Sequence, residues 1–581
     1  MKTYVMNRYW ILFVCIYFFS CHSDRHEAPK ARIAKGNIHY GGVLRINEIE
    51  DFRSLFPLNI TETTSAQIAY QVYEGLVKLS SADLSIKPCL AEKWVVNDSA
   101  NVFTFYIRKG VRYNDDACFE GSKGRELKAA DVQYCFDKIC EAQADNQGYW
   151  LFRGKVVGAD GYYQSTQKKA PLSSGVSGIR VVDDYTLQIR LLHPFAGFLH
   201  MLTTPFAFIY PKEAFDAYHE EMRTHCVGTG PFYVDQLKEG EGVVLKRNEN
   251  YWGMDSLGNT LPYLDAIQYS FIKEKKTELM EFRKGNLDVV HQLPLEMIDD
   301  VVGELDDAKR QSRSFDVHTL PAMSIQYYGF QHQGSIFNRK EVRQAFNYAI
   351  DREKIVDFTL QGEGLPAIHG IVPPAFNAYH TDAVRGYEFN PGKAQKLMAI
   401  AGYPQGKKFP AVTLQINSGG SRNLQVAEVI QKMLKENLNV EVSFEVMPFA
   451  QHLENLEAGR APFWRSAWVA DYPDPENFLN LLFGEHVPAK KSERSYINSV
   501  RYMSLAFDSV FRNAQHQVDL EKRYALLQKA DQIAMDDAAI MPLFYDEYTD
   551  LVQKRVLNYH VNAMNFQDFT SVYLMASGKK K

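Results

Sequence analysis

A single aspartate near two prolines is the group in this chain best suited to bind a charged ligand. It lies in the segment from Phe463 to Leu479, which reads FWRSAWVADYPDPENFL. Alternation places Arg465 and Asp471 on one face of a strand and Trp468 on the other, and the prolines stop further sheet pairing. We interpret Asp471 as the anchor for the cationic end of a ligand. The simpler alternative is that Asp471 caps a turn with its own backbone, as aspartate before proline often does.

Two further strands and a helix are expected to position this segment. Residues 411–416 and 439–446 alternate between apolar and polar types, and residues 426–434 follow helical spacing. A strand, a helix and a strand in this order demand a parallel pair with a right-handed crossover. Ligands of such sheets bind outside the carboxyl ends of the strands. The first strand runs into NSGGSR, Asn417 to Arg422, so we expect Asn417, Arg422 and Asp471 at the same edge.

The composition indicates a globular protein with two or three cores. The chain has 581 residues, of which 46% are hydrophobic and 23% are charged, and its net charge is -5. No basic stripe or RNA-binding motif occurs, so no nucleic-acid partner is expected. The 16 histidines are scattered and no Cys/His metal spacing occurs, so no zinc or other metal is expected. The five cysteines that follow Cys21 allow at most two disulfides.

The N-terminus has the pattern of an export signal. A basic start is followed by an apolar run from Tyr9 to Phe19 that is too short for a permanent membrane span. The run ends in FFSC, which resembles a bacterial lipobox with Cys21 as the lipidated residue. We therefore expect a signal peptide over residues 1–20, and a lipid-anchored tether over residues 21–37.

Motifs along the rest of the chain carry a resemblance to a known family. They begin with LAEKWVVNDSANVFTFYIRKGVRYNDD, from Leu90 to Asp116. They continue with VGTGPFY at 227–233, VLKRNENYWG at 244–253, GNLD at 285–288, VRQAFNYAIDR at 342–352 and AQKLMAIAGY at 394–403. In this order they resemble the family 5 solute-binding proteins of ABC importers, which include oligopeptide and dipeptide binders. Each motif alone is weak, whereas the series in register is specific.

The resemblance implies the fold. It is an α/β fold of the periplasmic-binding-protein type (type II, cluster C), with two main lobes around a cleft, a smaller extra domain and hinge closure. The implied parts are lobe I over 38–73, 182–290 and 531–581, extra domain II over 74–181, and lobe III over 291–530. The local sequence, independently of the resemblance, predicts a helix from Ile68 to Leu79, across the boundary between lobe I and extra domain II.

The resemblance also implies roles for residues of the site. In peptide-binding members a tryptophan, two residues, an aspartate and a tyrosine supply the carboxylate that binds the peptide's α-ammonium, and Trp468, Asp471 and Tyr472 match this pattern. Arg465 corresponds to a group near the peptide's carboxylate, and Arg422 is a weaker candidate for that role. The α-carbons of Arg465 and Asp471 are at most ~20 Å apart on a straight strand, which suits a peptide of a few residues. The chain departs from the family pattern at two positions. Gly334 stands where the oligopeptide binder has a lysine that serves longer peptides, and Val469 stands where the family has a disulfide cysteine.

The expected function is that of a receptor. It binds short extended peptides through their backbone and termini, closes around them, and delivers them to the permease of an ABC importer and, indirectly, its ATPase. We expect a monomer without a cofactor, anchored by lipid to a membrane on the periplasmic side of the cell envelope.

Two other functions remain open. The same fold could bind a nickel chelate, a haem-like ligand or an oligosaccharide; a sugar would stack on aromatic rings and need no isolated carboxylate. A hydrolase could use Asp471, Asp474 and Glu476 as acid and base. Closely spaced acids around prolines are more often a solvated turn, and HExxH, GxSxG and P-loop motifs are missing from the sequence, so we expect no enzyme.

Overall fold

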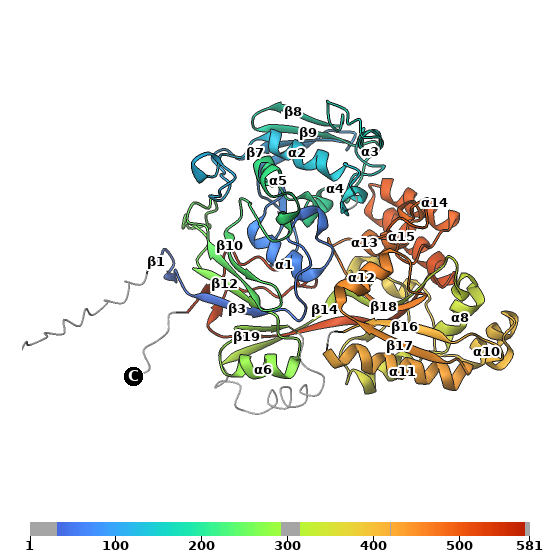
Figure 1. Cartoon of the computed structure of the whole chain (residues 1–581). Helices are drawn as coiled ribbons and strands as arrows, with labels where there is room; N and C mark the ends of the chain where they lie inside the picture. The colour runs from blue at the N-terminus through green and yellow to red at the C-terminus, as the bar shows by residue number, and fades with distance from the viewer. Residues whose placement is uncertain (1–31, 144, 292–313, 419, 576–581) are drawn as a thin grey trace, which may run out of the picture.

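The computed structural model of the chain describes residues 32–143, 145–291, 314–418 and 420–575 (Figure 1). The expected signal peptide and Cys21 lie outside the described residues. At the end of the expected tether, β1 (Ile33–Ala34) pairs with β2 (Ile38–His39). In the part of the chain that is described, no helix combines the length and the apolar character needed to cross a bilayer.

A four-stranded sheet organises the N-terminal lobe. Its order is β10 (Phe232–Lys238), β11 (Gly242–Arg247), β12 (Ala266–Ser270) and β3 (Val43–Asn47), with β3 parallel to β12. Leu44 and Ile46 are fully buried on one face of β3, as alternation predicts. Helix α1 (Thr63–Val72) begins at Glu62, whose side chain accepts from the Ser65 backbone N–H. The sheet and α1 are called the N-terminal lobe below.

The predicted helix from Ile68 to Leu79 is wrong in its second half. Helix α1 ends at Val72, and β4 (Val77–Leu79) pairs instead with β5 (Ile86–Pro88). Between them the Ile209 backbone N–H donates to the Glu74 carbonyl at 3.0 Å. A Cβ at Gly75 would lie 3.0 Å from the Leu202 carbonyl oxygen, so a larger residue would press on that segment. Pairing with a remote segment therefore overrides the local helical pattern.

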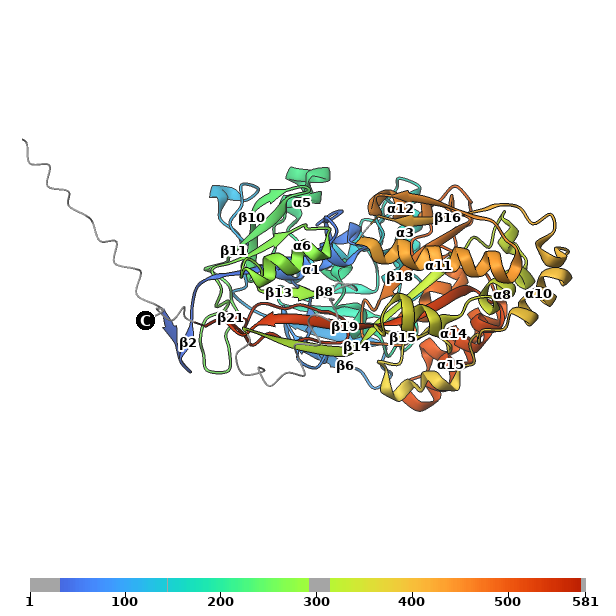
Figure 2. The same ribbon diagram turned by 90° about the horizontal axis from the view of Figure 1, so that it is seen from below.

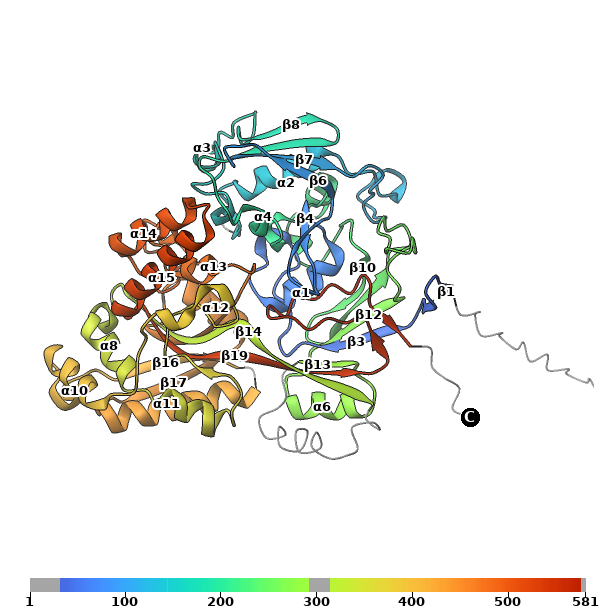
Figure 3. The ribbon, with the colours of Figure 1, turned by 180° about the vertical axis from the view of Figure 1, so that it is seen from behind.

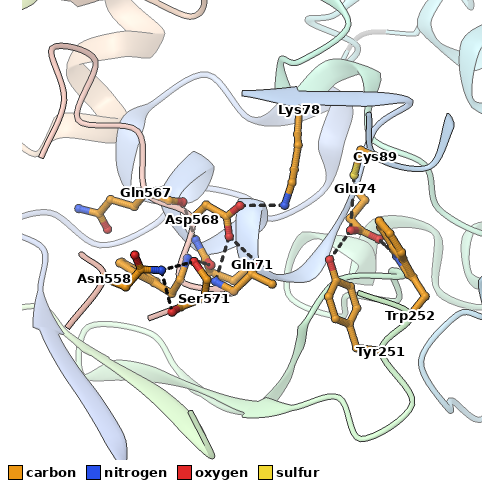
Figure 4. A network of polar contacts seen from close by, with 12 residues as sticks. Gln71, Glu74, Lys78, Cys89, Tyr251, Trp252, Asn558, Gln567, Asp568 and Ser571 are labelled. Atoms are coloured by element: carbon orange, nitrogen blue, oxygen red, sulfur yellow. Dashed lines mark hydrogen bonds and ion pairs between the residues drawn. The ribbon is translucent and has the colours of Figure 1, made fainter. Parts of the chain in front are cut away.

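A buried carboxylate explains why several of the sequence motifs occur together. Glu74 accepts hydrogen bonds of 2.8 Å from Tyr251 Oη and Trp252 Nε1 (Figure 4). Thr229 Oγ1 also donates to it at 2.8 Å. Cys89 Sγ donates to the same carboxylate at 3.5 Å. The glycine-rich turn at 227–233 and the strand exit at 244–253 thus meet at one point of the N-terminal lobe.

An antiparallel sheet forms the extra domain. It contains β6 (Ala91–Val96), β7 (Val102–Ile107), β9 (Thr186–Arg190) and β8 (Ile179–Asp183), in that order. Helix α2 (Ala129–Ile139) lies beside this sheet at the top of Figure 1. The expected boundary between residues 181 and 182 falls inside β8.

Two long strands connect the lobes. β14 (Phe315–Phe330) pairs antiparallel with β19 (Ile540–Gln553), in a sheet of order β13–β19–β14–β18–β16–β17 in which β15 (Leu365–Pro366) also pairs with β19. At one end of this sheet lies β13 (Val289–His291). Figures 2 and 3 show β14 and β19 running from the side of α6 (Lys275–Arg283) to the side of α11 (Gly420–Leu438).

The C-terminal lobe contains the predicted strand, helix and strand. β16 (Val412–Asn417) and β17 (Val442–Met447) are parallel and are joined by α11, which confirms this prediction. Helix α11 buries Val426, Ile430 and Leu434 at helical spacing. β18 (Phe463–Val469) pairs with β14 along its length and with β16 only at Phe463 and Trp464. This part of the sheet and the helices around it are called the C-terminal lobe below.

Further helices cover these sheets. In the C-terminal lobe they are α8 (Lys340–Tyr348), α9 (Arg352–Lys354), α10 (Pro391–Ile400), α12 (Phe449–Glu457), α13 (Glu476–Leu479), α14 (Leu505–His516) and α15 (Leu520–Asp536). Elsewhere they are α3 (Ala159–Gln167), α4 (Phe198–Met201) and α5 (Lys212–Tyr218), and a last pair of short strands is β20 (Val556–Leu557) with β21 (Tyr573–Leu574).

Candidate functional site

A cavity of about 500 Å³ lies between the N-terminal and C-terminal lobes. One wall consists of residues 47–50 after β3 and of residues in and before α1, together with the start of α6. The opposite wall consists of residues 465–471 in and after β18, the start of α11, and α12. Both walls therefore present the carboxyl ends of parallel strands, as expected for ligand sites in such sheets.

Asp471 lies two residues beyond the end of β18 and lines this cavity. Asn477 Nδ2 donates to Asp471 Oδ2 at 3.2 Å. Burial raises the pKa of Asp471 from 3.8 to about 6, against the lowering effect of the Asn477 hydrogen bond. Within the residues that the structure describes, no basic side chain forms an ion pair with Asp471. A half-buried carboxylate without a cationic partner among the described residues faces the space between the lobes.

The turn after Asp471 is capped by a different aspartate. Asp474 Oδ1 accepts from the Glu476 backbone N–H at 2.9 Å. The Asp471 backbone N–H donates to Asn477 Oδ1 at 3.1 Å. The carboxylate of Asp471 thus takes no part in the turn hydrogen bond that the simpler interpretation assigned to it.

Arg465 lines the same cavity from within β18. Arg465 Nη1 donates to Asn417 Oδ1 at 3.2 Å, and Nη2 donates to Gln326 Oε1. Burial lowers the pKa of the Arg465 guanidinium, while the nearby Asp546 raises it. The described part of the chain offers Arg465 amide oxygens but no carboxylate within ion-pair distance. Arg465 is therefore a half-buried cation at the cavity with neutral hydrogen-bond partners.

Asn417 and Arg422 also line the cavity, and they differ in the partners that they contact. Asn417 ends β16 and orients Arg465. Arg422 pairs with Glu363 at 3.2 Å and with Asp546 at 3.5 Å, and its guanidinium lies over the Phe544 ring. The structure thus brings Asn417, Arg422, Arg465 and Asp471 to one cavity, with Arg422 already neutralised by its own chain.

Of the two aromatic candidates, Trp468 lines the cavity and Tyr472 does not. Trp468 lines the cavity, and its Nε1 donates to Asn477 Oδ1 at 2.8 Å. Tyr472 is fully buried in a hydrophobic core, and its hydroxyl donates to Glu476 Oε2. Tyr472 does not line the cavity. Its assignment as a residue that contacts the ligand stays a prediction without a supporting contact.

Several cavity residues have no signal in the local sequence. Tyr70 of α1 and Tyr496 line the cavity near Asp471; burial raises the pKa of both hydroxyls, and the charge of Asp471 adds to this effect. His452 of α12 donates from Nε2 to the Arg465 carbonyl at 3.0 Å, with Nδ1 accepting from Gln415. Asn477, which binds Asp471, lies six residues after it in the same segment but does not itself line the cavity.

The acids proposed for a hydrolase do not converge. Asp474 forms a two-pronged ion pair with Arg523 at 2.8 and 2.9 Å. Glu476 accepts from Tyr472 and from Gln515 Nε2 at 2.8 Å. Of these acids only Asp471 lines the cavity. Within the described ranges, no group of three or more His, Cys, Asp or Glu residues could hold a metal ion, and the cysteines there are free.

Two α/β lobes joined by long strands around a cavity define a solute-binding protein of the periplasmic-binding-protein type. The family model of the bacterial extracellular solute-binding proteins, family 5, matches residues 85–488. The chain therefore belongs to this family.

Relatives and solved structures match over most of the chain. The dipeptide-binding protein of Escherichia coli is 27% identical and the match covers 88% of this chain and 90% of that protein. Haem-binding protein A of Haemophilus influenzae is also 27% identical, with 89% of each chain covered. The structure of Helicobacter pylori DppA in complex with the peptide STSA has a TM-score of 0.79, with 25% identity over 92% of this chain and 98% of that chain. Haemophilus influenzae OppA in complex with RPPGFSPFR has a TM-score of 0.78 at 20% identity, over 93% and 100% of the two chains, which shows the fold.

Proposed function

We propose that this protein is the binding subunit of an ABC importer and binds short, extended peptides between its lobes. It is proposed to hand the peptide to the permease rather than to cleave it. The observation that carries the proposal is Asp471, a half-buried carboxylate at the cavity without a cationic partner among the described residues.

The energetics of Asp471 favour a ligand with an ammonium group. A carboxylate that is left unpaired and shielded from water when the lobes close opposes closure by about 3–5 kcal/mol of free energy. A ligand ammonium between the lobes removes this cost only when the lobes are closed, so the ligand stabilises the closed state. The α-ammonium of a peptide is such a group.

The free edge of β18 favours an extended backbone. The Ala470 N–H donates to the Met323 carbonyl of β14, so by ladder alternation Ala467 and Val469 direct their main-chain groups to the other side. On that side, within the described chain, β16 pairs only as far as Trp464. Ala467 and Val469 also line the cavity, where a peptide could add a strand.

The carboxylate end of the peptide is assigned to Arg465. Its guanidinium has amide partners only, so a carboxylate could join them without displacing an ion pair. Arg422 is less suited to bind the peptide carboxylate, because its guanidinium is already paired with Glu363 and Asp546.

The proposed organisation follows the sheets. Lobe I comprises residues 38–73 and the chain from 191 to 290, in place of the expected 182–290, with the C-terminal segment, because β3, β10, β11 and β12 share one sheet. We place the end of extra domain II after Arg190 rather than at 181, because β8 and β9 share its sheet, and the end of lobe III after α15 at Asp536 rather than at 530. Lipidation at Cys21 and attachment to a membrane on the periplasmic side remain part of the proposal.

Calorimetry with blocked peptides tests the proposal. Tri-alanine is titrated into the protein beside N-acetyl-tri-alanine, which lacks the α-ammonium. We expect binding of the free peptide and a loss of at least about 100-fold on acetylation. Peptides recovered intact after incubation would agree with a receptor. Equal binding of both peptides would contradict the role of Asp471, and haem or a sugar released from the purified protein on denaturation would point to another solute.

A further inference from the structure

Two carboxylates lie on the cavity wall opposite Asp471. β3 ends at Asn47, and Glu48 and Glu50 follow it into the cavity lining. The Glu48 backbone N–H donates to the Ser270 carbonyl at the end of β12, which is parallel to β3. The backbone thus holds Glu48 at the carboxyl end of a parallel pair, as β18 and the residues after it hold Asp471 on the other wall.

Neither carboxylate has a partner in the described chain. Glu48 Oε1 and Glu50 Oε1 are buried and accept no hydrogen bond there. The cations nearest Glu48 are used elsewhere, since Lys275 pairs with Glu278 at 2.6 Å and His291 pairs with Asp550 at 3.2 Å. Burial raises the pKa of Glu48 to about 7, although His291 and Lys275 lower it. Burial also raises the pKa of Glu50, against the fields of Lys273 and Arg465.

Four other acids of the cavity have partners. Glu62 accepts from the Ser65 and Arg53 backbone N–H groups at 2.7 and 2.8 Å, and Asp550 pairs with His291 at 3.2 Å. Glu363 pairs with Arg422 at 3.2 Å, and Glu457 pairs with Arg53 at 3.2 Å. Eight carboxylates line the cavity against four lysine and arginine side chains, so the lining as a whole is acidic. Among the described residues, Glu48 and Glu50 on one wall have neither an ion pair nor a hydrogen-bond donor, and Asp471 on the other wall has only the Asn477 amide.

A neutral acceptor completes the wall. Gln67 of α1 lines the cavity and is 3% exposed, and its Oε1 accepts no hydrogen bond from the described residues. Tyr269 lies near both residues: its hydroxyl donates to the Gln67 backbone carbonyl at 3.4 Å, and burial, with a smaller contribution from the charge of Glu48, raises the Tyr269 pKa. Carboxylate and amide oxygens without donors suit an ammonium or guanidinium group.

We propose that Glu48, Glu50 and Gln67 form a second cation subsite, which selects peptides with a cationic side chain. This inference rests on the proposed peptide function and adds the substrate class. One ligand with two cationic groups would neutralise acids on both lobes, and so would favour closure more than a ligand with an ammonium alone. A metal ion is the less fitting occupant, because no cluster of three ligating side chains is found among the described residues.

Three matched tripeptides test the subsite by calorimetry at pH 8. They are Ala-Lys-Ala, Ala-norleucine-Ala and Ala-Glu-Ala, which share a backbone and differ in side-chain charge. We expect the lysine peptide to bind at least about tenfold more tightly than the norleucine peptide, and the glutamate peptide to bind more weakly than both. In the double variant Glu48→Gln/Glu50→Gln, the ratio of the affinities for the lysine and norleucine peptides should fall to about one. The control Glu92→Gln, which changes an exposed carboxylate of β6, should keep the ratio of the parent protein.

Each outcome decides between the two proposals. If the three peptides bind the parent protein with equal affinity, the peptide function stands and the subsite is overturned. A lysine preference that persists in the double variant would overturn its assignment to Glu48 and Glu50. If none of the peptides binds, the peptide function falls and the subsite falls with it. The comparison in the parent protein needs no variant, so a double variant that fails to fold leaves the test intact.

Discussion

Asn477 contacts Asp471 through both ends of its side-chain amide. Its Nδ2 donates to Asp471 Oδ2 at 3.2 Å, and its Oδ1 accepts the Asp471 backbone N–H at 3.1 Å. The same Oδ1 accepts from Trp468 Nε1 at 2.8 Å, and Asn477 is only 1% exposed. The side chains of the tryptophan and the aspartate are therefore fixed relative to each other before a ligand arrives, which reduces the entropy lost on binding.

Asp471→Asn should weaken the binding of a free-amino peptide. Removing one charge of a desolvated pair costs about 2–5 kcal/mol, so calorimetry should show a loss of about 100-fold or more. Asp98→Asn, the same change at an exposed position, is the control. Unchanged affinity in Asp471→Asn would show that the ammonium binds elsewhere.

The same variant should stabilise the ligand-free protein at high pH. Because burial raises the Asp471 pKa from 3.8 to about 6, the folded protein holds a proton more tightly than the unfolded chain. The ionised Asp471 carboxylate lowers the free energy of unfolding. This effect is absent below pH 3.8, grows as the pH rises toward 6, and then stays constant at about 3 kcal/mol. Thermal unfolding should show a higher Tm for Asp471→Asn than for the parent at pH 8, and a smaller difference at pH 5. A lower Tm at pH 8 would contradict this account.

Asn477→Ala should shift the pH dependence of peptide binding. The Asn477 hydrogen bond lowers the Asp471 pKa, so its loss raises that pKa and moves the acid limb of the affinity profile to higher pH. We also expect about tenfold weaker binding at neutral pH, because Trp468 loses its acceptor. A variant that lost stability while its affinity profile kept its pH midpoint would show a structural role only.

Glu74→Gln should destabilise the N-terminal lobe without touching the cavity lining. Both carboxylate oxygens of Glu74 accept hydrogen bonds, Oε1 from Tyr251 and Oε2 from Thr229 and Trp252. A glutamine amide replaces one of these oxygens with an NH2 group, which cannot accept. Unpaired buried donors cost about 1–3 kcal/mol, which urea unfolding should detect as a lower midpoint. Glu92→Gln serves as the exposed control. Equal midpoints for the two variants would count against the network.

Arg53→Ala should accelerate peptide release. Arg53 Nη1 lies 3.2 Å from Glu457 Oε1 of α12, an ion pair between the two lobes whose carboxylate side chain is 4% exposed. Its loss removes an ion pair that joins the two lobes around the ligand, so stopped-flow displacement should show a dissociation rate about 3- to 10-fold higher. Arg460→Ala, which breaks an exposed pair with Glu454 inside one lobe, should leave the rate unchanged. The same rate change in both would exclude a specific effect on closure.

The local sequence determined much of the C-terminal lobe. Alternation and helical spacing predicted β16, α11 and β17, because each buries one apolar face against its neighbours. The same periodicity placed Asp471 just after a strand, and the order of short motifs indicated the family. Such features depend on neighbours within a few residues, which the sequence displays directly.

Only the tertiary structure decided which side chains share the cavity. Arg422 is neutralised by Glu363 and Asp546, which are remote in the sequence, and Tyr472 turns into a core that its motif does not reveal. Glu48 and Glu50 face Asp471 because β14 and β19 bring the two lobes together. These contacts depend on long-range chain crossings, and no local periodicity records which residue a crossing will place opposite another.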